Sequence, residues 1–228
     1  MTLINCDLGE CLSPNPDQQI MPLIDQASIA CGGHAGDSES IARAVQLAKQ
    51  YQVKIGAHPS YPDKANFGRI RQHYEANALF EHLYRQVEQL NDICLKQDAV
   101  MSYIKPHGAL YHAVMRDPAT LAVIGQVLDA FPQSLSLIVE AGTDTSHLRD
   151  FALCRPSTLI YEAFADRAYH NNKIVPRSEQ GAMLRDVAEI IEQYQEFSTT
   201  SALKVDTVCF HSDHPPSVDA LKRIKARR

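Results

Sequence analysis

The sequence predicts a single α/β domain whose parallel strands close into a barrel. Short apolar runs alternate with helical patterns along the 228 residues, which is the order typical of a parallel α/β fold. None of these runs alternates cleanly between apolar and polar residues, so each is expected to be buried on both faces. A polar cluster follows nearly every run, which favours a closed barrel over an open doubly wound sheet. One domain over residues 1–228 fits this length.

Seven apolar runs are expected to form the strands of this barrel. In chain order they are Leu3–Cys6, Ser28–Cys31, Val53–Ala57, Ser102–Lys105, Leu135–Glu140, Thr158–Ala163 and Val205–His211. The helical patterns among them are Ser38–Tyr51, Tyr74–Lys96, Pro118–Phe131, Gly181–Tyr194 and Ser217–Lys225. Asp37 is the predicted N-cap of the first helix, and Pro118 is suited to a first helical turn.

Composition and charge exclude several classes of protein. The formal net charge of −5 argues against a broad nucleic-acid-binding surface, and the basic residues that end the chain are typical of a solvated helix end. No apolar stretch approaches the ~18–20 residues that a membrane span needs, and residues 1–10 lack the features of a secretory signal. The six cysteines include no Cys-x-x-Cys pair, so we expect reduced thiols and a cytoplasmic protein.

The first two polar clusters combine carboxylates, glycines and a histidine. Asp7 and Glu10 follow the first run and could supply a general base or a cation ligand, although a capped turn would also explain Asp7. Three glycines surround His34 after the second run, where a close backbone approach to a ligand and an anion-binding helix start are both expected. The alternative is a simple strand-to-helix turn that Asp37 caps.

The next two clusters carry cations and imidazoles. His58 follows the third run, and a Pro-rich loop then reaches Arg69, which could pair with a substrate carboxylate or only with a surface carboxylate. Lys105, His107 and Tyr111 follow the fourth run within seven residues. Together they offer an electrophile, an acid or base and a hydrogen-bond donor. A lysine at a buried strand end also needs a partner or a chemical task.

Charged residues accompany the sixth run as well. Glu162 lies on an otherwise apolar strand, and Asp166 and Arg167, which could pair with each other, come directly after it. Further along, Arg177 and Ser178 precede an expected helix and could hold an anionic group there.

The last run and the absent motifs narrow the chemistry further. His211 and Asp213 lie two residues apart at the end of the last run, so both are expected to face one side. The chain contains no phosphate loop, no Gly-x-Gly-x-x-Gly, no Gly-x-Ser-x-Gly and no His-Glu-x-x-His. Conventional nucleotide-binding, nicotinamide-dependent, serine-hydrolase and zincin functions are therefore disfavoured.

Six of these motifs occur in an order that resembles the LamB/YcsF family over nearly the whole chain. They are Asn5–Glu10, Ile29–Asp37, Gly56–Asp63, Lys105–Tyr111, Glu162–Arg167 and Val175–Ser178. The resemblance implies an irregular seven-stranded TIM-like barrel of the glycoside hydrolase/deacetylase superfamily. It also implies the activity of the characterised members, the A subunit of bacterial ATP-dependent 5-oxoprolinase. That enzyme opens 5-oxo-L-proline to L-glutamate with hydrolysis of ATP and needs subunits B and C.

The clusters and the resemblance together give the candidate site residues. The catalytic candidates are Asp7, Glu10, His34, His58, Lys105 and His107, and the substrate-binding candidates are Asn5, Gly33, Arg69, Tyr111, Glu162, Arg177 and His211. Asp7 or Glu10 is expected to activate water, the imidazoles to act as acids, bases or polarising groups, and Lys105 to stabilise negative charge. ATP with Mg²⁺ is expected as a cofactor shared with the partner subunits, and a metal bound by this chain itself stays open.

The sequence departs from the family pattern at a few positions and leaves two other functions open. Cys11–Ser13 replaces the usual Ser-Phe-Gly, Ser38 and Gln180 replace prolines, and His211–Asp213 replaces His-Gly-Asp. The first alternative is a metal-dependent, deacetylase-like amide hydrolase acting alone, with Asp7 and one of the three candidate histidines as zinc ligands. The second is a protein that binds 5-oxoproline without chemistry. The oligomeric state stays open, a homodimer included.

Overall fold

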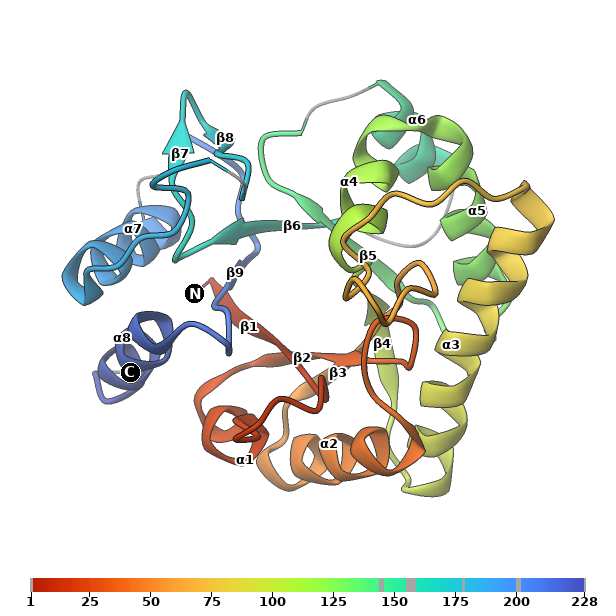
Figure 1. The fold of residues 1–228 in the computed structure, drawn as a ribbon, viewed down its shortest axis with the longest axis horizontal. Coiled ribbons are helices and arrows are strands. Elements are labelled where there is room, and N and C mark those ends of the chain that lie inside the picture. The colour runs from red at the N-terminus through yellow and green to blue at the C-terminus, as the bar shows by residue number, and fades with distance from the viewer. Residues whose placement is uncertain (1, 144–145, 155–158, 178, 200–201, 228) are drawn as a thin grey trace.

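Seven parallel strands form a closed barrel in the middle of the molecule (Figure 1). The computed structural model describes residues 2–143, 146–154, 159–177, 179–199 and 202–227. Around the ring the strands are β1 (Leu3–Leu8), β2 (Gln26–Ala30), β3 (Lys54–His58), β4 (Met101–Ile104), β5 (Ser136–Glu140), β6 (Leu159–Phe164) and β9 (Thr207–Cys209). β9 pairs in parallel with both β1 and β6, which closes the ring. The predicted seven-stranded TIM-like barrel is therefore confirmed.

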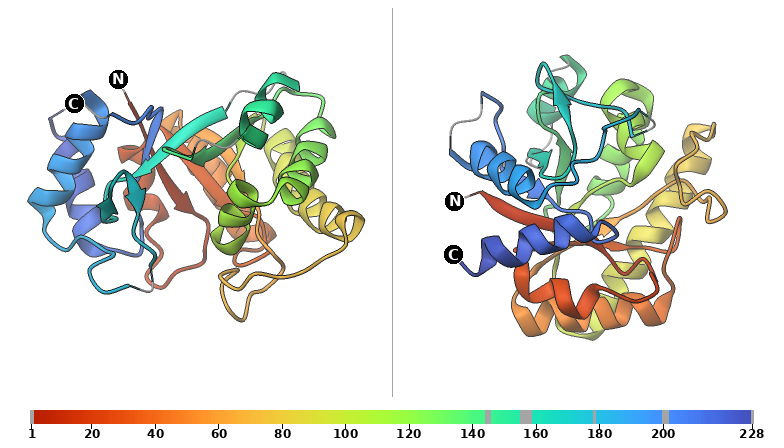
Figure 2. Two further views of the ribbon diagram at one scale, coloured as in Figure 1. Left: turned by 90° about the horizontal axis from the view of Figure 1, so that it is seen from above. Right: turned by 60° about the vertical axis from the view of Figure 1, so that its left-hand side comes forward.

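Helices form a layer outside the strands. They are α1 (Asp17–Ile20), the 3-10 helix η1 (Met21–Leu23), α2 (Ser38–Tyr51), α3 (Ala76–Lys96), α4 (Gly108–Arg116), α5 (Pro118–Asp129), α6 (Ser146–Cys154), α7 (Val187–Thr199) and α8 (Pro215–Lys225). A small antiparallel hairpin, β7 (Tyr169–His170) and β8 (Lys173–Ile174), lies between β6 and α7 in the chain. Figure 2 shows the blue α7 and α8 at one end of the molecule and the yellow and green α3 to α5 at the other. Within the described ranges, no helix is both long and apolar enough to cross a membrane.

Local sequence signals explain the best-defined helices. α2 begins after Asp37, whose carboxylate accepts a hydrogen bond from the Ser40 amide at 2.8 Å, while the Ser40 hydroxyl bonds back to the Asp37 amide at 2.9 Å. This reciprocal capping box satisfies two amides of the first turn. In α3, apolar residues recur at helical spacing from Leu79 to Cys94 and are buried. Pro118 opens α5, where it costs no hydrogen bond.

The Tyr103 ring fills part of the barrel interior. It lies on β4, is 1 % exposed, and places its hydroxyl 3.3 Å from that of Ser28 on β2. On β3 the neighbouring residue is Gly56, where any Cβ atom would overlap the Tyr103 ring. The pairing of β3 with β4 also shifts register beside Gly56. Packing therefore requires glycine at this position.

We expect Gly56→Ala to lower the free energy of unfolding by about 1–3 kcal/mol, the usual cost of overpacking a tight core. Equilibrium unfolding in urea measures this change. Tyr103→Leu in the same background should recover part of the loss, because the added methyl group meets the Tyr103 ring. An alanine variant as stable as the wild type would show that the ring does not pack against Gly56.

The predicted strands and helices are largely found, with differences at their ends. The helix predicted from Gly181 starts at Val187 instead, so this prediction is wrong at its start; residues 182–184 form backbone hydrogen bonds with the segment after β6. The last strand is shorter than predicted, so His211 lies beyond it. The helices α1, α4 and α6 and the β7–β8 hairpin were not predicted. Thr158, the expected start of the sixth strand, lies outside the described residues.

Candidate active site

A cavity of about 420 Å³ lies at the carboxyl ends of the barrel strands, where α/β barrels carry their active sites. Its volume falls within the range of small-molecule sites. Most of the predicted site residues line it: Asp7, Glu10, His58, Arg69, Lys105, His107, Tyr111, Arg177 and His211. The remaining candidates are buried and are not part of its lining: Asn5, Gly33, His34 and Glu162.

Lys105 is the centre of a buried network of charged groups. Its Nζ lies 2.8 Å from Asp7 Oδ1 at the end of β1 and 2.8 Å from Glu162 Oε1 on β6. It also donates a hydrogen bond to Asn5 Oδ1 at 3.2 Å. Burial alone would lower the pKa of Lys105, but its anionic neighbours, Asp7 foremost, raise it well above the ordinary value. These contacts join the ammonium group of Lys105 to carboxylates on two other strands, β1 and β6.

The two carboxylates beside Lys105 have different environments. Burial would raise the pKa of Asp7, but His58 and Lys105 outweigh it and hold the pKa well below the usual range. Glu162 is fully buried, and for this group burial outweighs Lys105 and raises the pKa. The Asp7 side chain is 17 % exposed and faces the cavity. Asp7 is therefore an ionised carboxylate in a fixed position that a ligand can reach.

Backbone carbonyl groups fix two histidines next to this network. His58 Nδ1 lies 2.7 Å from the carbonyl oxygen of Lys105, and His107 Nε2 lies 2.9 Å from that of Phe67. The other two ring nitrogens, His58 Nε2 and His107 Nδ1, face each other at 2.9 Å. Burial, and after it the neighbouring His58, lowers the pKa of His107 far below its usual value. His107 is therefore a neutral imidazole.

Two glycines allow the loop after β3 to lie against the start of α4. Gly68 and Gly108 have φ values of +63° and +55°, which favour glycine. A Cβ atom on Gly108 would lie 2.6 Å from the Gly68 carbonyl oxygen, to which the Ala109 amide donates a hydrogen bond at 3.0 Å. This close approach places the Phe67 carbonyl against His107.

Glu10 and His34 complete a cluster with these two histidines. Glu10 Oε1 lies 3.2 Å from His34 Nε2 and 3.9 Å from His107 Nδ1, and the rings of His34 and His107 stack at 3.6 Å. Burial, and then the charge of Asp7, raises the pKa of Glu10 to about 7, and burial lowers that of His34 to about 2. One ligand atom from each of Glu10, His34, His58 and His107 lies within 4.8 Å of the others. These four side chains could hold a metal ion.

His211 and Asp166 form a further histidine–carboxylate pair. The fully buried Asp166 carboxylate accepts hydrogen bonds from the His211 amide at 2.9 Å and from its Nδ1 at 2.7 Å. The imidazole also stacks on Phe164, with the ring centres 5.8 Å apart. The predicted pairing of Asp166 with Arg167 is wrong, because the two side chains point to different groups; Arg167 donates to the Val175 carbonyl at 2.6 Å.

This pair predicts a pH-dependent contribution to stability. Burial opposes both charges, but each partner outweighs it, so the pKa of Asp166 is lowered and that of His211 is raised. The Asp166 contribution is present above about pH 3.9, its unfolded pKa, and is lost as the pH falls through the folded pKa. The His211 contribution is fully present below about pH 6.5 and is lost as the pH rises through the raised folded pKa.

His211→Gln should therefore cost more stability at pH 5.5 than at pH 9.5, with a loss of about 1–3 kcal/mol at the lower pH. Urea unfolding of both proteins at the two pH values measures the difference. His214→Gln is the matched control, since that ring faces the Leu184 carbonyl at 2.7 Å rather than a carboxylate. If His211→Gln lowered the free energy of unfolding equally at both pH values, the Asp166–His211 pair would not make the expected pH-dependent contribution to stability.

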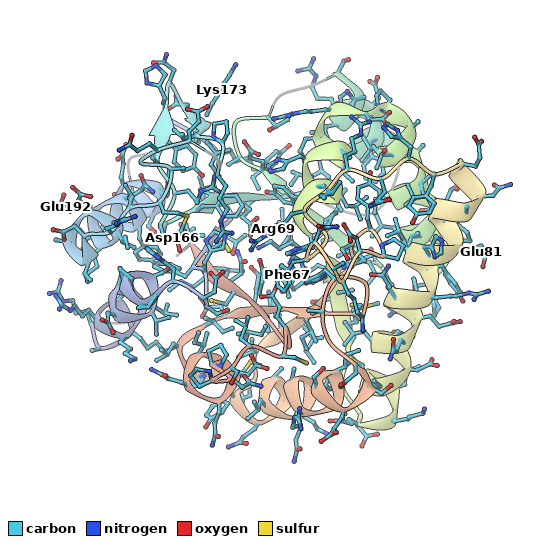
Figure 3. All side chains as sticks on the ribbon, viewed as in Figure 1. Phe67, Arg69, Glu81, Asp166, Lys173 and Glu192 are labelled. Atoms are coloured by element: carbon cyan, nitrogen blue, oxygen red, sulfur yellow. The ribbon has the colours of Figure 1, made fainter. Side chains whose placement is uncertain are left out.

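Arginine side chains surround the cavity: Arg69, Arg71, Arg116, Arg167 and Arg177. Arg177 pairs with Asp213 at 3.4 Å. Arg69 lies 5.0 Å from the centre of the Phe67 ring and, among the described residues, has no carboxylate within ion-pair distance. Figure 3 shows Phe67 and Arg69 near the middle of the molecule, with Glu81 and Glu192 on its periphery. The charge of Arg69 is therefore available to an anionic ligand.

Other sequence motifs have mainly structural roles in the fold. The start of α2 is capped by Asp37 rather than left open to an anion. A Cβ atom on Gly33 would overlap Gln86 and lie 2.6 Å from Ser60 Oγ, so glycine at this position allows close packing. The helix expected beside Ser178 begins further along the chain, and Ser178 itself lies outside the described residues.

Sequence reasoning did not single out several residues of the cavity wall: Phe67, Arg71, His112, Arg116 and Phe164. Single arginines and aromatic residues form no local motif, so no sequence signal marked them. The bond between Asp166 and His211 was also missed, because 45 positions separate these residues. The available signal was their position after two strands that neighbour each other in a closed barrel, β6 and β9.

Comparison with known proteins agrees with this architecture. The sequence profile of the LamB/YcsF family matches residues 3–228. Two similar proteins are named as the A subunit of 5-oxoprolinase. The one from Vibrio cholerae serotype O1 is 37% identical over 98% of this chain, and the match covers 96% of its own length. The one from Pseudomonas fluorescens (strain Pf0-1) is 40% identical over 98% of this chain, and the match covers 95% of its own length. The crystal structure of the lactam utilization protein from Thermus thermophilus aligns with a TM-score of 0.86 at 29% identity, covering 99% of this chain and 96% of that one.

Fold and site together define the class of protein. It is a parallel α/β barrel with a polar, histidine-rich cavity at the carboxyl ends of its strands. Within this class the chain belongs to the LamB/YcsF family, as the full-length profile match and the two relatives show. The resemblance inferred from the six motifs is thereby confirmed.

Proposed function

We propose that this chain is the A subunit of an ATP-dependent 5-oxoprolinase, a hydrolase that opens 5-oxo-L-proline to L-glutamate together with subunits B and C. The observation that carries the proposal is the match to proteins named as the A subunit of 5-oxoprolinase, at 37% and 40% identity over 98% of the chain. The cavity supplies a chemical basis, since it joins a fixed carboxylate, a carboxylate-bound histidine and an available arginine.

The lactam carbonyl is a poor electrophile, because amide resonance places electron density on its oxygen. In the proposed reaction the lactam oxygen takes the γ-phosphoryl group of Mg²⁺-bound ATP, and ADP leaves. Water adds to the activated carbon, the ring C–N bond breaks, and the nitrogen takes a proton to give γ-glutamyl phosphate. A second water hydrolyses this acyl phosphate to glutamate and inorganic phosphate. ATP is shared with subunits B and C, since the chain has no phosphate loop.

Asp7 is the proposed base that removes a proton from the attacking water. Its carboxylate faces the cavity and is held at 2.8 Å by Lys105, so it stays ionised and keeps one orientation. Glu162 holds Lys105 from β6 at 2.8 Å. Lys105 is therefore a positioning residue, which keeps Asp7 aimed into the cavity.

His211 is the proposed acid that protonates the leaving nitrogen. Asp166 binds its Nδ1 at 2.7 Å, which fixes the ring and leaves Nε2 for proton transfer, as in other histidine–carboxylate pairs. Arg69 is the proposed partner of the substrate carboxylate, because a guanidinium can bind a carboxylate through two hydrogen bonds.

Glutamate release from 5-oxo-L-proline and Mg²⁺-ATP tests the function. The assay compares this chain alone, subunits B and C alone, and all three together. Turnover confined to the complete mixture would support the proposal. No turnover in that mixture, while the same B and C preparations are active with a known A subunit, would contradict it.

One observation favours a second candidate function, an amide hydrolase that acts alone with a bound metal. It is the group of four potential ligands formed by Glu10, His34, His58 and His107, in which Glu10 and not the expected Asp7 is the carboxylate. The same assay separates the two functions, because this hydrolase would open an amide without ATP, B or C.

A further inference from the structure

We infer that Glu10, His34, His58 and His107 form a binding site for one divalent transition-metal ion. Three imidazole nitrogens and one carboxylate suit a borderline ion such as Zn²⁺ or Co²⁺. The site follows from the hydrogen bonds of His58 and His107, which determine which ring nitrogen of each residue can bind a metal ion. It does not depend on a lactam as substrate, since metal binding is measured without turnover.

The hydrogen bonds of the two rings determine which nitrogens keep their lone pairs. A carbonyl oxygen only accepts hydrogen bonds, so the ring nitrogen that faces one carries the proton. His58 Nδ1 faces the Lys105 carbonyl at 2.7 Å, and His107 Nε2 faces the Phe67 carbonyl at 2.9 Å. If both rings are neutral, the lone pairs are therefore on His58 Nε2 and His107 Nδ1. These atoms face each other at 2.9 Å, and Asp7 Oδ2 lies 3.4 Å from the same His58 Nε2. Without a positive charge at this point, two lone pairs and a carboxylate would face one another.

The remaining ligand atoms lie around the same point at distances that suit a metal ion. Ligands about 2.0–2.1 Å from a tetrahedral ion are about 3.4 Å from one another. Glu10 Oε1 lies 3.2 Å from His34 Nε2 and 3.9 Å from His107 Nδ1, and with His58 all four ligand atoms lie within 4.8 Å of one another. Small side-chain movements would therefore give a tetrahedral arrangement.

The surrounding backbone holds two of these ligands as a metal site requires. Histidine ligands almost always donate their second N–H to a carbonyl or carboxylate, which fixes the ring. Here the segments that supply these groups are themselves held, because the Lys105 amide donates to Ala57 and the His107 amide to Pro59, both at 2.8 Å. His34 is 2 % exposed, and its Nδ1 has no hydrogen-bond partner among the described residues. The Nε2 atom of the same ring faces Glu10.

A proton between His58 and His107 is the competing explanation. A proton on His58 Nε2 would also remove the repulsion, at a distance that suits an N–H···N hydrogen bond to His107, and Asp7 Oδ2 lies 3.4 Å from that nitrogen. In that case the cluster would not bind a metal ion through Glu10. The two explanations therefore differ in what Glu10→Gln does.

The experiment strips the purified protein with a chelator and then titrates it with Co²⁺ and with Zn²⁺. We expect one ion per chain, by elemental analysis and by the visible absorption of bound Co²⁺ in a tetrahedral nitrogen-rich site. His58→Ala, His107→Ala and Glu10→Gln should each weaken binding by at least about 100-fold, since loss of an outer-shell partner alone costs 10- to 100-fold. His112→Ala, a histidine on the same cavity wall that is not part of the cluster, should bind as the wild type does.

The folding of each variant is checked separately, so that a loss of metal binding can be attributed to the substituted ligand and not to unfolding. Circular dichroism establishes whether each variant is folded, and Glu10→Gln keeps the shape of the side chain if the alanine variants do not fold. A wild-type protein that binds neither ion stoichiometrically would overturn the site. Equal metal affinity of the wild type and Glu10→Gln would also overturn the four-ligand site. It would favour a proton between His58 and His107 as the explanation of their close approach.

Discussion

Replacement of Lys105 with methionine should lower the free energy of unfolding by about 3–5 kcal/mol, the usual cost of breaking a buried ion pair from one side. Asp7 and Glu162 contact the same ammonium nitrogen at 2.8 Å. Without it two neighbouring carboxylates would be left in a buried site with no cation between them. Equilibrium unfolding in urea near pH 7 measures the loss.

A second substitution tests this cause of the loss. Lys105→Met combined with Glu162→Gln should recover part of the stability, because only one carboxylate would then remain in the site. Lys222→Met on the exposed side of α8 is the control and should change stability by less than about 0.5 kcal/mol. If Lys105→Met were as harmless as Lys222→Met, the ion-pair network would contribute little to the fold.

Asp7→Asn should reduce glutamate release by the complete mixture of A, B and C chains by about 10²- to 10⁴-fold, the usual contribution of a general base. Asparagine keeps the shape of the side chain and can still contact Lys105, but it cannot take a proton from water. The effect should fall on kcat rather than on KM, because Asp7 acts on the water and not on the substrate carboxylate.

Two controls separate this catalytic loss from a structural one. Glu81→Gln removes a carboxylate at the periphery of the molecule (Figure 3) and should leave turnover within about twofold, as expected for a surface change. The binding of B and C by Asp7→Asn, measured in a pull-down, should match the wild type. Full turnover of Asp7→Asn would show that another group activates the water.

The fold was predictable where local signals and burial agreed. α2 has its predicted bounds because the Asp37 cap, the apolar stripe and the end at Tyr51 all point to the same helix. The helix predicted from Gly181 failed at its start because the residues there bond through the backbone to the segment after β6. α4 was missed because the polar cluster from Lys105 to Tyr111 indicated a loop, whereas its second half begins a helix.

The site was predictable as a set of residues but not as an arrangement. In a parallel barrel, polar residues that follow the strands meet at one end, so Asp7, His58 and Lys105 could be grouped from the sequence. No local pattern shows that the charge of Lys105 is neutralised by carboxylates from two other strands. Nor does any pattern give the stacking of His34 on His107, which depends on how loops from different strands pack.

The closure of the ring by β9 has a consequence for the order of folding. β9 pairs with β1 through residues about 204 positions apart, and it follows the other six strands of the ring in the chain. Until β9 is in place, the folding chain exposes two unpaired strand edges, on β1 and β6, which are prone to pair with other chains. Such distant contacts also slow folding. Recombinant yield should therefore depend on chaperones and on growth temperature more than for a helical protein of this size.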